Sequence, residues 1–170
     1  MRMTTCALIG ANLLVVTMAH ADPNRYIFAG DQSLGNWDIV RMNDDGTNMV
    51  RLTSSSANEF GFDVSPDGLH MAFNSNATGT HQVYVMDLAT GSAHQITSTG
   101  QNMFPRWSHD GGRLLVSSAL SPGSADDLVT VNADGSDLHF LTNSGLNETQ
   151  GEWSPDGSKI VFSKGMPNGS

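Results

Sequence analysis

Short runs of alternating hydrophobic and polar residues follow one another along most of the chain. One stretch shows the pattern in full, with apolar-rich runs at 102–107, 113–117, 127–132 and 138–142. Segments rich in Gly, Asp, Ser and Asn separate these runs, and each run is too short for a typical helix. The pattern therefore predicts short antiparallel strands joined by tight turns, and an all-β fold.

Three sequence markers recur in the same order with nearly the same period. A Ser-x-Asp-Gly turn begins at Ser65, Ser108 and Ser154, at spacings of 43 and 46 residues. An apolar residue followed by Thr recurs at Thr53, Thr97 and Thr142, at spacings of 44 and 45. Between them lies a small polar turn, at 45–47, 90–92 and 134–136. A period of about 40 to 45 residues with several strands per unit is typical of β-propeller blades.

The units divide the chain into two whole blades and two partial ones. The whole blades are 58–97 and 102–142, each with four expected strands. The partial units are 24–53, which lacks a first strand, and 147–170, which has only the first two. Closed propellers need at least about four blades. We therefore expect an open arc of about three to four blades, belonging to a truncated propeller or to one that closes by self-association.

Residues 1–21 have the order of a secretory signal peptide. Arg2 supplies a positive charge, 6–18 is mostly apolar, and Ala19-His20-Ala21 is a small-x-small cleavage pattern. The alternative is an N-terminal helix of the folded domain. Cleavage near Ala21 would give a periplasmic or secreted protein with no membrane insertion, and would remove the single cysteine, Cys6.

The charge balance limits the classes of partner. The chain has 8 basic and 17 acidic side chains, a formal net charge of −9, and no basic stripe. Such a surface repels nucleic acids and anionic membranes. A protein or a polar ligand is the expected partner.

The repeated segments resemble a known family. WSPDGSKIVFS at 153–163 and VYVMD at 83–87 are similar to the TolB-like β-propeller repeat, a periplasmic relative of WD-repeat propellers. Departures are Val64 where the other units have Trp107 and Trp153, His109 in the turn, and a short loop at 33–35. The resemblance implies a role in the cell-envelope Tol-Pal system, where family members bind a peptidoglycan-associated lipoprotein. We expect no N-terminal α/β domain of that family, because the repeats begin soon after the signal peptide.

No catalytic constellation is visible in the sequence. There is no G-x-S-x-G elbow, and the recurring Ser and Asp of the Ser-x-Asp-Gly turns are expected to cap those turns. The histidines of the mature chain fall at different phases of the repeat and suggest no metal site; they are His70, His81, His94, His109 and His139. We therefore expect no cofactor. The weaker alternative is calcium at 43–46 or 132–135, where the full spacing of a calcium loop is absent.

The expected binding surface is the rim opposite the regular hairpins. Inter-blade connections there lead into the innermost strands, so six residues are expected near the channel mouth: Asn58, Glu59, Asn102, Met103, Asn147 and Glu148. Trp107 and Trp153 recur in phase and are expected to pack between blades. Trp37 lies outside that phase, which makes it the aromatic residue expected to bind at the surface.

Two classes of function remain open. The first is a non-enzymatic protein-interaction scaffold of the TolB type. The alternative is an accessory propeller domain of a prolyl-oligopeptidase-like peptidase or of a propeller-type polysaccharide lyase.

Overall fold

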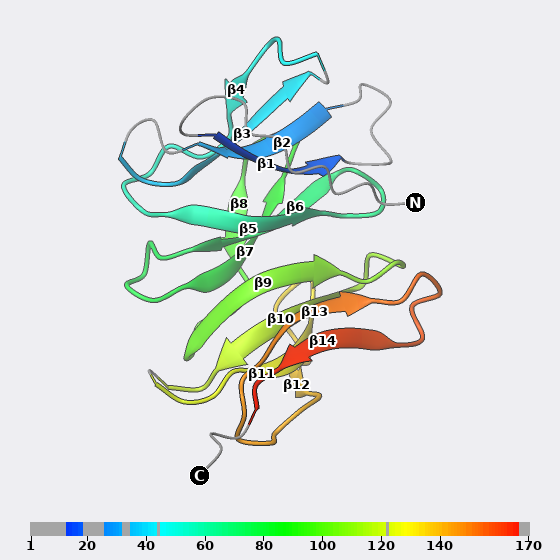
Figure 1. The fold of residues 1–170 in the computed structure, drawn as a ribbon. Helices are drawn as coiled ribbons and strands as arrows, with labels where there is room; N and C mark the ends of the chain where they lie inside the picture. The colour runs from blue at the N-terminus through cyan, green and yellow to red at the C-terminus, as the bar shows by residue number, and fades with distance from the viewer. Residues whose placement is uncertain (1–12, 19–25, 32–34, 44, 122, 167–170) are drawn as a thin grey trace.

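The fold consists of antiparallel sheets. The computed structural model describes residues 13–18, 26–31, 35–43, 45–121 and 123–166, and the secondary structure in these residues is β-strand without helix (Figure 1). Within the described residues, no helix is long and apolar enough to cross a membrane. The strands form three four-stranded sheets and one two-stranded sheet, and each sheet keeps the order of its strands in the chain.

The strands of each sheet have the following bounds. The first sheet contains β1 (Leu13–Met18), β2 (Tyr26–Asp31), β3 (Asp38–Asn43) and β4 (Val50–Arg51). The second contains β5 (Glu59–Val64), β6 (His70–Ser75), β7 (Gln82–Asp87) and β8 (Ala93–Gln95). The third contains β9 (Gln101–Trp107), β10 (Arg113–Ala119), β11 (Asp127–Asn132) and β12 (His139–Phe140), and the last contains β13 (Glu148–Trp153) and β14 (Ile160–Lys164).

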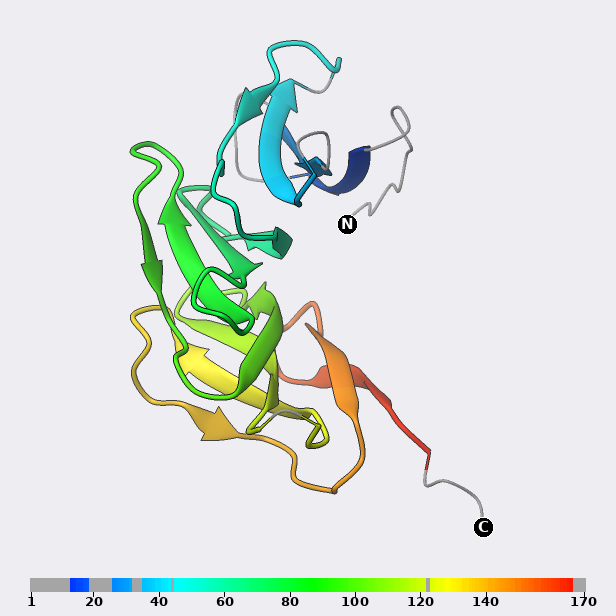
Figure 2. The ribbon, with the colours of Figure 1, turned by 90° about the vertical axis from the view of Figure 1, so that its left-hand side faces the viewer.

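The sheets follow one another along an open arc, with the first sheet and the β13–β14 pair at opposite ends (Figures 1 and 2). The innermost strand of each of the last two sheets contacts the sheet before it, as β9 contacts β5 and β6, and β13 contacts β10. The predicted all-β propeller with four-stranded antiparallel blades and an open arc is therefore confirmed.

The first sheet is more complete than the repeat pattern indicated. The sequence left the unit at 24–53 without an innermost strand, but β1 pairs antiparallel with β2 in that position. In the uncut chain, six residues of the expected signal peptide, 13–18, thus occupy the place of the missing strand. The rest of that segment, 1–12 and 19–21, lies outside the described residues, and its cleavage remains a prediction.

The hydrophobic core lies at the junctions between sheets. One cluster joins the second and third sheets and includes Val83, Val85, Trp107, Leu114 and Val129. Another joins the first and second sheets through Ile39. Trp107 is only 2% exposed, which confirms the prediction that this tryptophan packs between blades.

The same hydrogen bonds stabilise all three Ser-x-Asp-Gly turns. The Ser108 hydroxyl donates to Asp110 Oδ1 at 2.6 Å and accepts from the Arg113 amide at 3.0 Å. The corresponding bonds recur in the turns that begin at Ser65 and Ser154. The glycine that ends each turn has a φ of 71–74°, a conformation that favours Gly. The predicted structural role of these serines is confirmed.

The recurring threonine ties the fourth strand to the third. Thr97 Oγ1 accepts a hydrogen bond from the Val83 amide at 2.9 Å and donates to Gln82 Oε1 at 2.8 Å. Thr53 bonds the Ile39 amide in the same way, at 2.8 Å. The period-44 marker in the sequence therefore reflects a buried hydrogen bond of the scaffold.

Each innermost strand bends at the same point. The pairing of β5, β9 and β13 with the neighbouring strand shifts register once in each sheet, as a β-bulge does. The residues at these bulges, Gly61, Phe104 and Gln150, have positive φ values of 59°, 55° and 56°. The Phe104 amide donates to Asn74 Oδ1 at 2.9 Å, and the Gln150 amide donates to Ser117 Oγ at 3.2 Å. Each of these two bonds joins one sheet to the next.

Candidate functional site

The irregular rim has one backbone contact that repeats at the three junctions between successive sheets. The carbonyl of the residue just before the third strand of a sheet accepts a hydrogen bond from an amide at the start of the next sheet. These bonds run from Glu59 to Trp37 at 2.6 Å, from Asn102 to His81 at 2.8 Å, and from Glu148 to Asp126 at 2.7 Å. Trp37, His81 and Asp126 therefore occupy the same repeat position, although Trp37 stood outside the phase of the other tryptophans.

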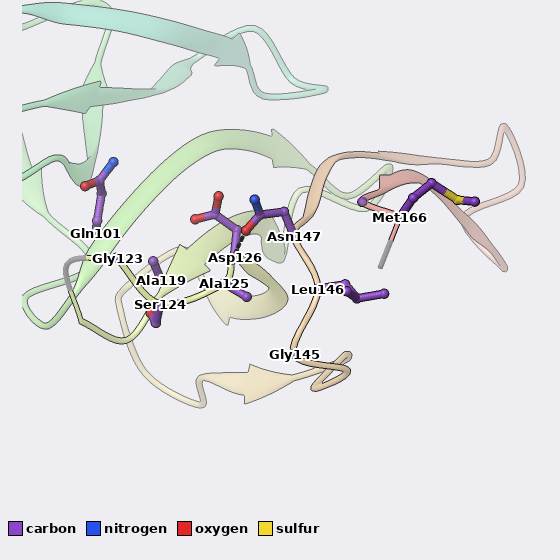
Figure 3. Close-up of a pocket in the computed structure, with 11 residues that line it drawn as sticks. Gln101, Ala119, Gly123, Ser124, Ala125, Asp126, Gly145, Leu146, Asn147 and Met166 are labelled. Atoms are coloured by element: carbon purple, nitrogen blue, oxygen red, sulfur yellow. Dashed lines mark hydrogen bonds between the residues drawn. The ribbon is translucent and has the colours of Figure 1, made fainter. Parts of the chain in front are cut away.

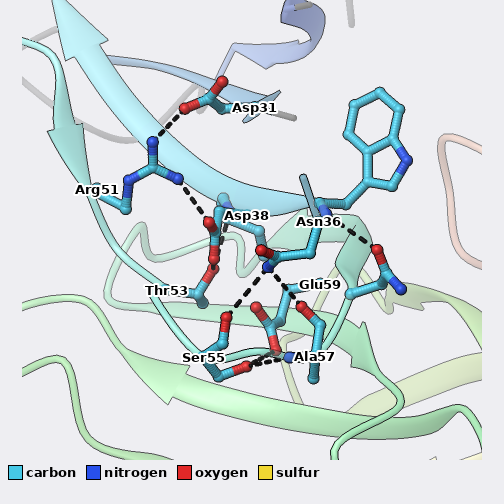
Figure 4. Close-up of polar contacts among 11 residues, drawn as sticks. Asp31, Asn36, Asp38, Arg51, Thr53, Ser55, Ala57 and Glu59 are labelled. Atoms are coloured by element: carbon cyan, nitrogen blue, oxygen red, sulfur yellow. Dashed lines mark hydrogen bonds and ion pairs between the residues drawn. The ribbon is translucent and has the colours of Figure 1, made fainter. Parts of the chain in front are cut away.

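Three of the expected rim residues are buried and hold the connections. Glu59 Oε1 accepts a hydrogen bond from the Ser55 hydroxyl at 2.7 Å (Figure 4). It accepts another from the Ser75 hydroxyl at 3.0 Å. Glu59 is 3% exposed, and Asn102 and Glu148 are each 1% exposed. The Asn102 Nδ2 atom donates to the Thr99 carbonyl at 2.8 Å. At these three positions the side chains fix the loops instead of extending into solvent.

Glu148 is tied to the start of the two-stranded sheet. Its Oε1 atom accepts from Lys164 Nζ at 2.5 Å and from Ser144 Oγ at 2.8 Å. Hydrogen bonds from Lys164, Thr142 and Ser144 lower the pKa of Glu148 to about 2. This carboxylate is therefore charged throughout the physiological pH range. It links Ser144, in the connection before β13, to Lys164 at the end of β14.

The other expected rim residues lie closer to solvent. Asn58 Oδ1 accepts the Trp37 amide at 3.0 Å, and Asn147 Oδ1 accepts the Asp126 amide at 3.1 Å. Asn147 is exposed, whereas Asn58, Met103 and Trp37 are half-buried. The structure thus brings the seven residues to one rim, but it divides them into buried anchors and accessible side chains.

A polar cluster supports the rim at the junction of the first two sheets. Arg51 forms ion pairs with Asp38, at 2.5 Å, and with Asp31 (Figure 4). In the adjoining connection, Asn36 Nδ2 donates to the carbonyls of Ser55 and Ala57, at 3.1 and 2.7 Å. These contacts hold the segment before β3, and hence Trp37, in a fixed place.

A pocket of about 570 Å³ opens on the same rim beside β13. Its walls come from the end of β10, the loop that leads into β11, the connection before β13, and the residues after β14 (Figure 3). The lining includes Gln101, Ser124, Asp126, Asn147 and Met166, and among the described lining residues Asp126 has the only acidic or basic side chain. Burial, together with the neighbouring charge of Asp127, raises the pKa of Asp126. This pocket was not among the sites expected from the sequence.

The loops considered for calcium use their carboxylates within their own turns. Asp45 Oδ1 accepts from the Thr47 amide at 2.9 Å, and Asp134 Oδ1 accepts from the Ser136 amide at 2.9 Å. Within the described part of the chain, no three His, Cys, Asp or Glu side chains are grouped so that they could hold a metal ion.

Comparison with known proteins agrees with the architecture. A family model described as the TolB beta propeller domain matches residues 24–167. The chain belongs to the TolB β-propeller family. A TolB homologue of Chlorobium chlorochromatii is 39% identical over 139 residues, which cover 82% of this chain and 31% of that protein. This chain spans about a third or less of the length of the curated TolB relatives it matches.

Solved structures show the same fold. TolB from Acinetobacter baumannii matches with a TM-score of 0.67 and 24% identity, over 80% of this chain and 34% of that one. An oligogalacturonate lyase in complex with manganese matches with a TM-score of 0.66 and 17% identity, over 85% of this chain and 43% of the lyase. At these identities the likeness concerns the propeller fold alone, which proteins of different activity share.

Proposed function

We propose that this TolB-family chain is a non-enzymatic scaffold that binds a protein partner at its irregular rim. The observation that carries the proposal is the repeat position of Trp37, His81 and Asp126. The backbone there is held by the same hydrogen bond in three units, at 2.6–2.8 Å, while the side chain changes from an indole to an imidazole to a carboxylate. A rigid scaffold that displays different side chains from equivalent places suits recognition.

The proposed setting is the periplasm or the cell exterior, and the proposed partner is a lipoprotein of the cell envelope. The expected signal peptide at 1–21 and the names of the TolB relatives support this setting. The net charge of −9 favours a protein partner over nucleic acid or an anionic lipid surface.

Calorimetric titration with the soluble domain of a peptidoglycan-associated lipoprotein from the same genome tests the proposal. Trp37→Ala is expected to weaken binding by roughly tenfold or more, because half-buried aromatic side chains often dominate interfaces. Leu69→Ala is the matched control, since Leu69 is 59% exposed and follows a Ser-x-Asp-Gly turn on the opposite rim. Equal effects of the two substitutions, or no binding by the unmodified chain, would contradict the proposal.

We further propose that the flank formed by β13 and β14 is covered in the functional assembly, by further blades or by a second copy. This sheet has two described strands where the preceding sheets have four. Its apolar side chains reach solvent, with Val161 69% exposed and Met166 86% exposed. Unpaired strand edges and apolar flanks promote association.

A further inference from the structure

The extra residues of the third unit lie in the loops that line the pocket. Gln82 follows Ser65 by 17 residues, whereas the equivalent Asp127 follows Ser108 by 19. Asn102 follows Thr97 by 5 residues, whereas the equivalent Glu148 follows Thr142 by 6. The three additional residues account for the longer spacing of 46 against 43 and fall in the loops before β11 and before β13. Insertions in repeat proteins often map to the binding face.

The equivalent of Asp126 in the second sheet makes an aromatic contact. His81, the equivalent of Asp126, packs its ring edge-on against Phe60, with centroids 5.0 Å apart. In the third sheet the equivalents are Asp126 and Met103, and the pocket opens beside Asp126. At this repeat position the second sheet has an imidazole in an aromatic contact, whereas the third sheet has a carboxylate that lines a pocket.

The Asp126 carboxylate has no cationic neighbour in the pocket. Within the described residues it takes part in no hydrogen bond or ion pair, and only its backbone groups are bonded. The adjacent charged groups are Asp127, which is also acidic, and Glu148, which already holds Lys164 at 2.5 Å. A half-buried carboxylate next to a second acid gains most from a ligand that brings a positive charge.

The other lining groups suit a polypeptide. Gly123, Gly145 and Gly165 place backbone next to the pocket, and the amides of Gln101 and Asn147 supply neutral polar groups. Figure 3 shows Asp126 beside Asn147, between Gln101 on one side and Met166 on the other. We infer that this pocket binds a lysine or arginine side chain of the partner, with Asp126 as the acceptor. The inference rests on the proposed partner-binding function and adds a specific contact to it.

The test is an NMR titration of the ¹⁵N-labelled chain with two end-blocked peptides, Gly-Gly-Lys-Gly-Gly and Gly-Gly-Gln-Gly-Gly. The lysine peptide is expected to shift the amide signals of Gly123, Gly145 and Gly165 at millimolar concentrations. Asp126→Asn is expected to weaken this binding roughly tenfold. Asp137→Asn is the charge-matched control, because Asp137 follows the turn at 134–136 on the opposite rim and has a φ of 56°, which Asn tolerates. That control is expected to change the affinity less than about twofold.

Several outcomes would overturn the inference. They are equal shifts by the glutamine peptide, unchanged affinity in Asp126→Asn, and no shift of the pocket signals up to about 10 mM lysine peptide. A third titration, with methylammonium chloride, separates a peptide site from a site for any small amine, and equal affinity for both would refute the peptide assignment. Trp37 does not line this pocket, and the peptide titrations do not use the lipoprotein, so failure of one proposal can be told apart from failure of the other.

Discussion

The junction between the second and third sheets depends on Trp107, and the loss of this side chain gives a direct measure of inter-blade packing. Trp107 is 2% exposed and belongs to the larger core cluster. Its Nε1 donates to the Asp63 carbonyl at 3.1 Å, so truncation opens a cavity and also leaves that carbonyl without this donor. Replacing a buried Trp by Ala typically costs about 3–5 kcal/mol. We expect Trp107→Ala to lower the free energy of unfolding by an amount in this range.

Trp153 provides an internal comparison for the same repeat position. It makes the equivalent bond, from Nε1 to the Arg106 carbonyl at 3.3 Å, but it is only half-buried beside the two-stranded sheet. Because less apolar area is removed from water, Trp153→Ala should cost about 1–2 kcal/mol. Urea unfolding followed by far-ultraviolet circular dichroism measures both variants. Equal losses, or a larger loss at Trp153, would refute the account in which burial at the junction stabilises the arc.

Three further substitutions test the scaffold and the exposed flank. Thr97→Val leaves the Val83 amide without its acceptor, so the free energy of unfolding should fall by about 1–3 kcal/mol, measured by urea denaturation. Hydrogen bonds from Ser154 and Ser158 lower the pKa of Asp156 from 3.8 to about 2. The stability that the Asp156 carboxylate contributes is therefore present above pH 3.8 and is lost as the pH falls toward 2. Ser154→Ala should make unfolding less pH-dependent between pH 4 and 2, and an unchanged acid titration would contradict this. Val161→Lys should lower the average mass in sedimentation equilibrium, and an unchanged mass would show that this flank does not drive association.

The repeat pattern predicted the sheets because propeller blades are encoded locally. The Ser-x-Asp-Gly turns and the recurring threonines make hydrogen bonds within one blade, so their spacing is visible in the sequence. Trp107 was also predictable as a core residue, because a bulky side chain that recurs once per unit fills the space between blades.

The site was less predictable because it depends on contacts between units. Glu59 and Glu148 were expected to be accessible rim residues, but both are buried, and Ser55 and Ser144 of the preceding connections donate hydrogen bonds to their carboxylates. The equivalence of Trp37 and Asp126 is visible in the sequence only as a spacing, because each lies 16 residues before a recurring threonine while the side chains differ. The pocket did leave one signal, the spacing of 46 residues against 43, which indicated an insertion but not its location.

The bulges on the innermost strands determine the order in which the sheets unfold locally. The bulge amides of Phe104 and Gln150 each bond to a side chain of the preceding sheet, so these neighbouring units are coupled in pairs. At the earlier junction the acceptor is Asn74, which is fully buried. At the later junction Gln150 is exposed and its bond to Ser117 is longer, at 3.2 Å. In a repeat array, where stability is set by each unit and its nearest neighbour, amide hydrogen exchange should therefore begin at β14 and β13 and reach the second sheet last.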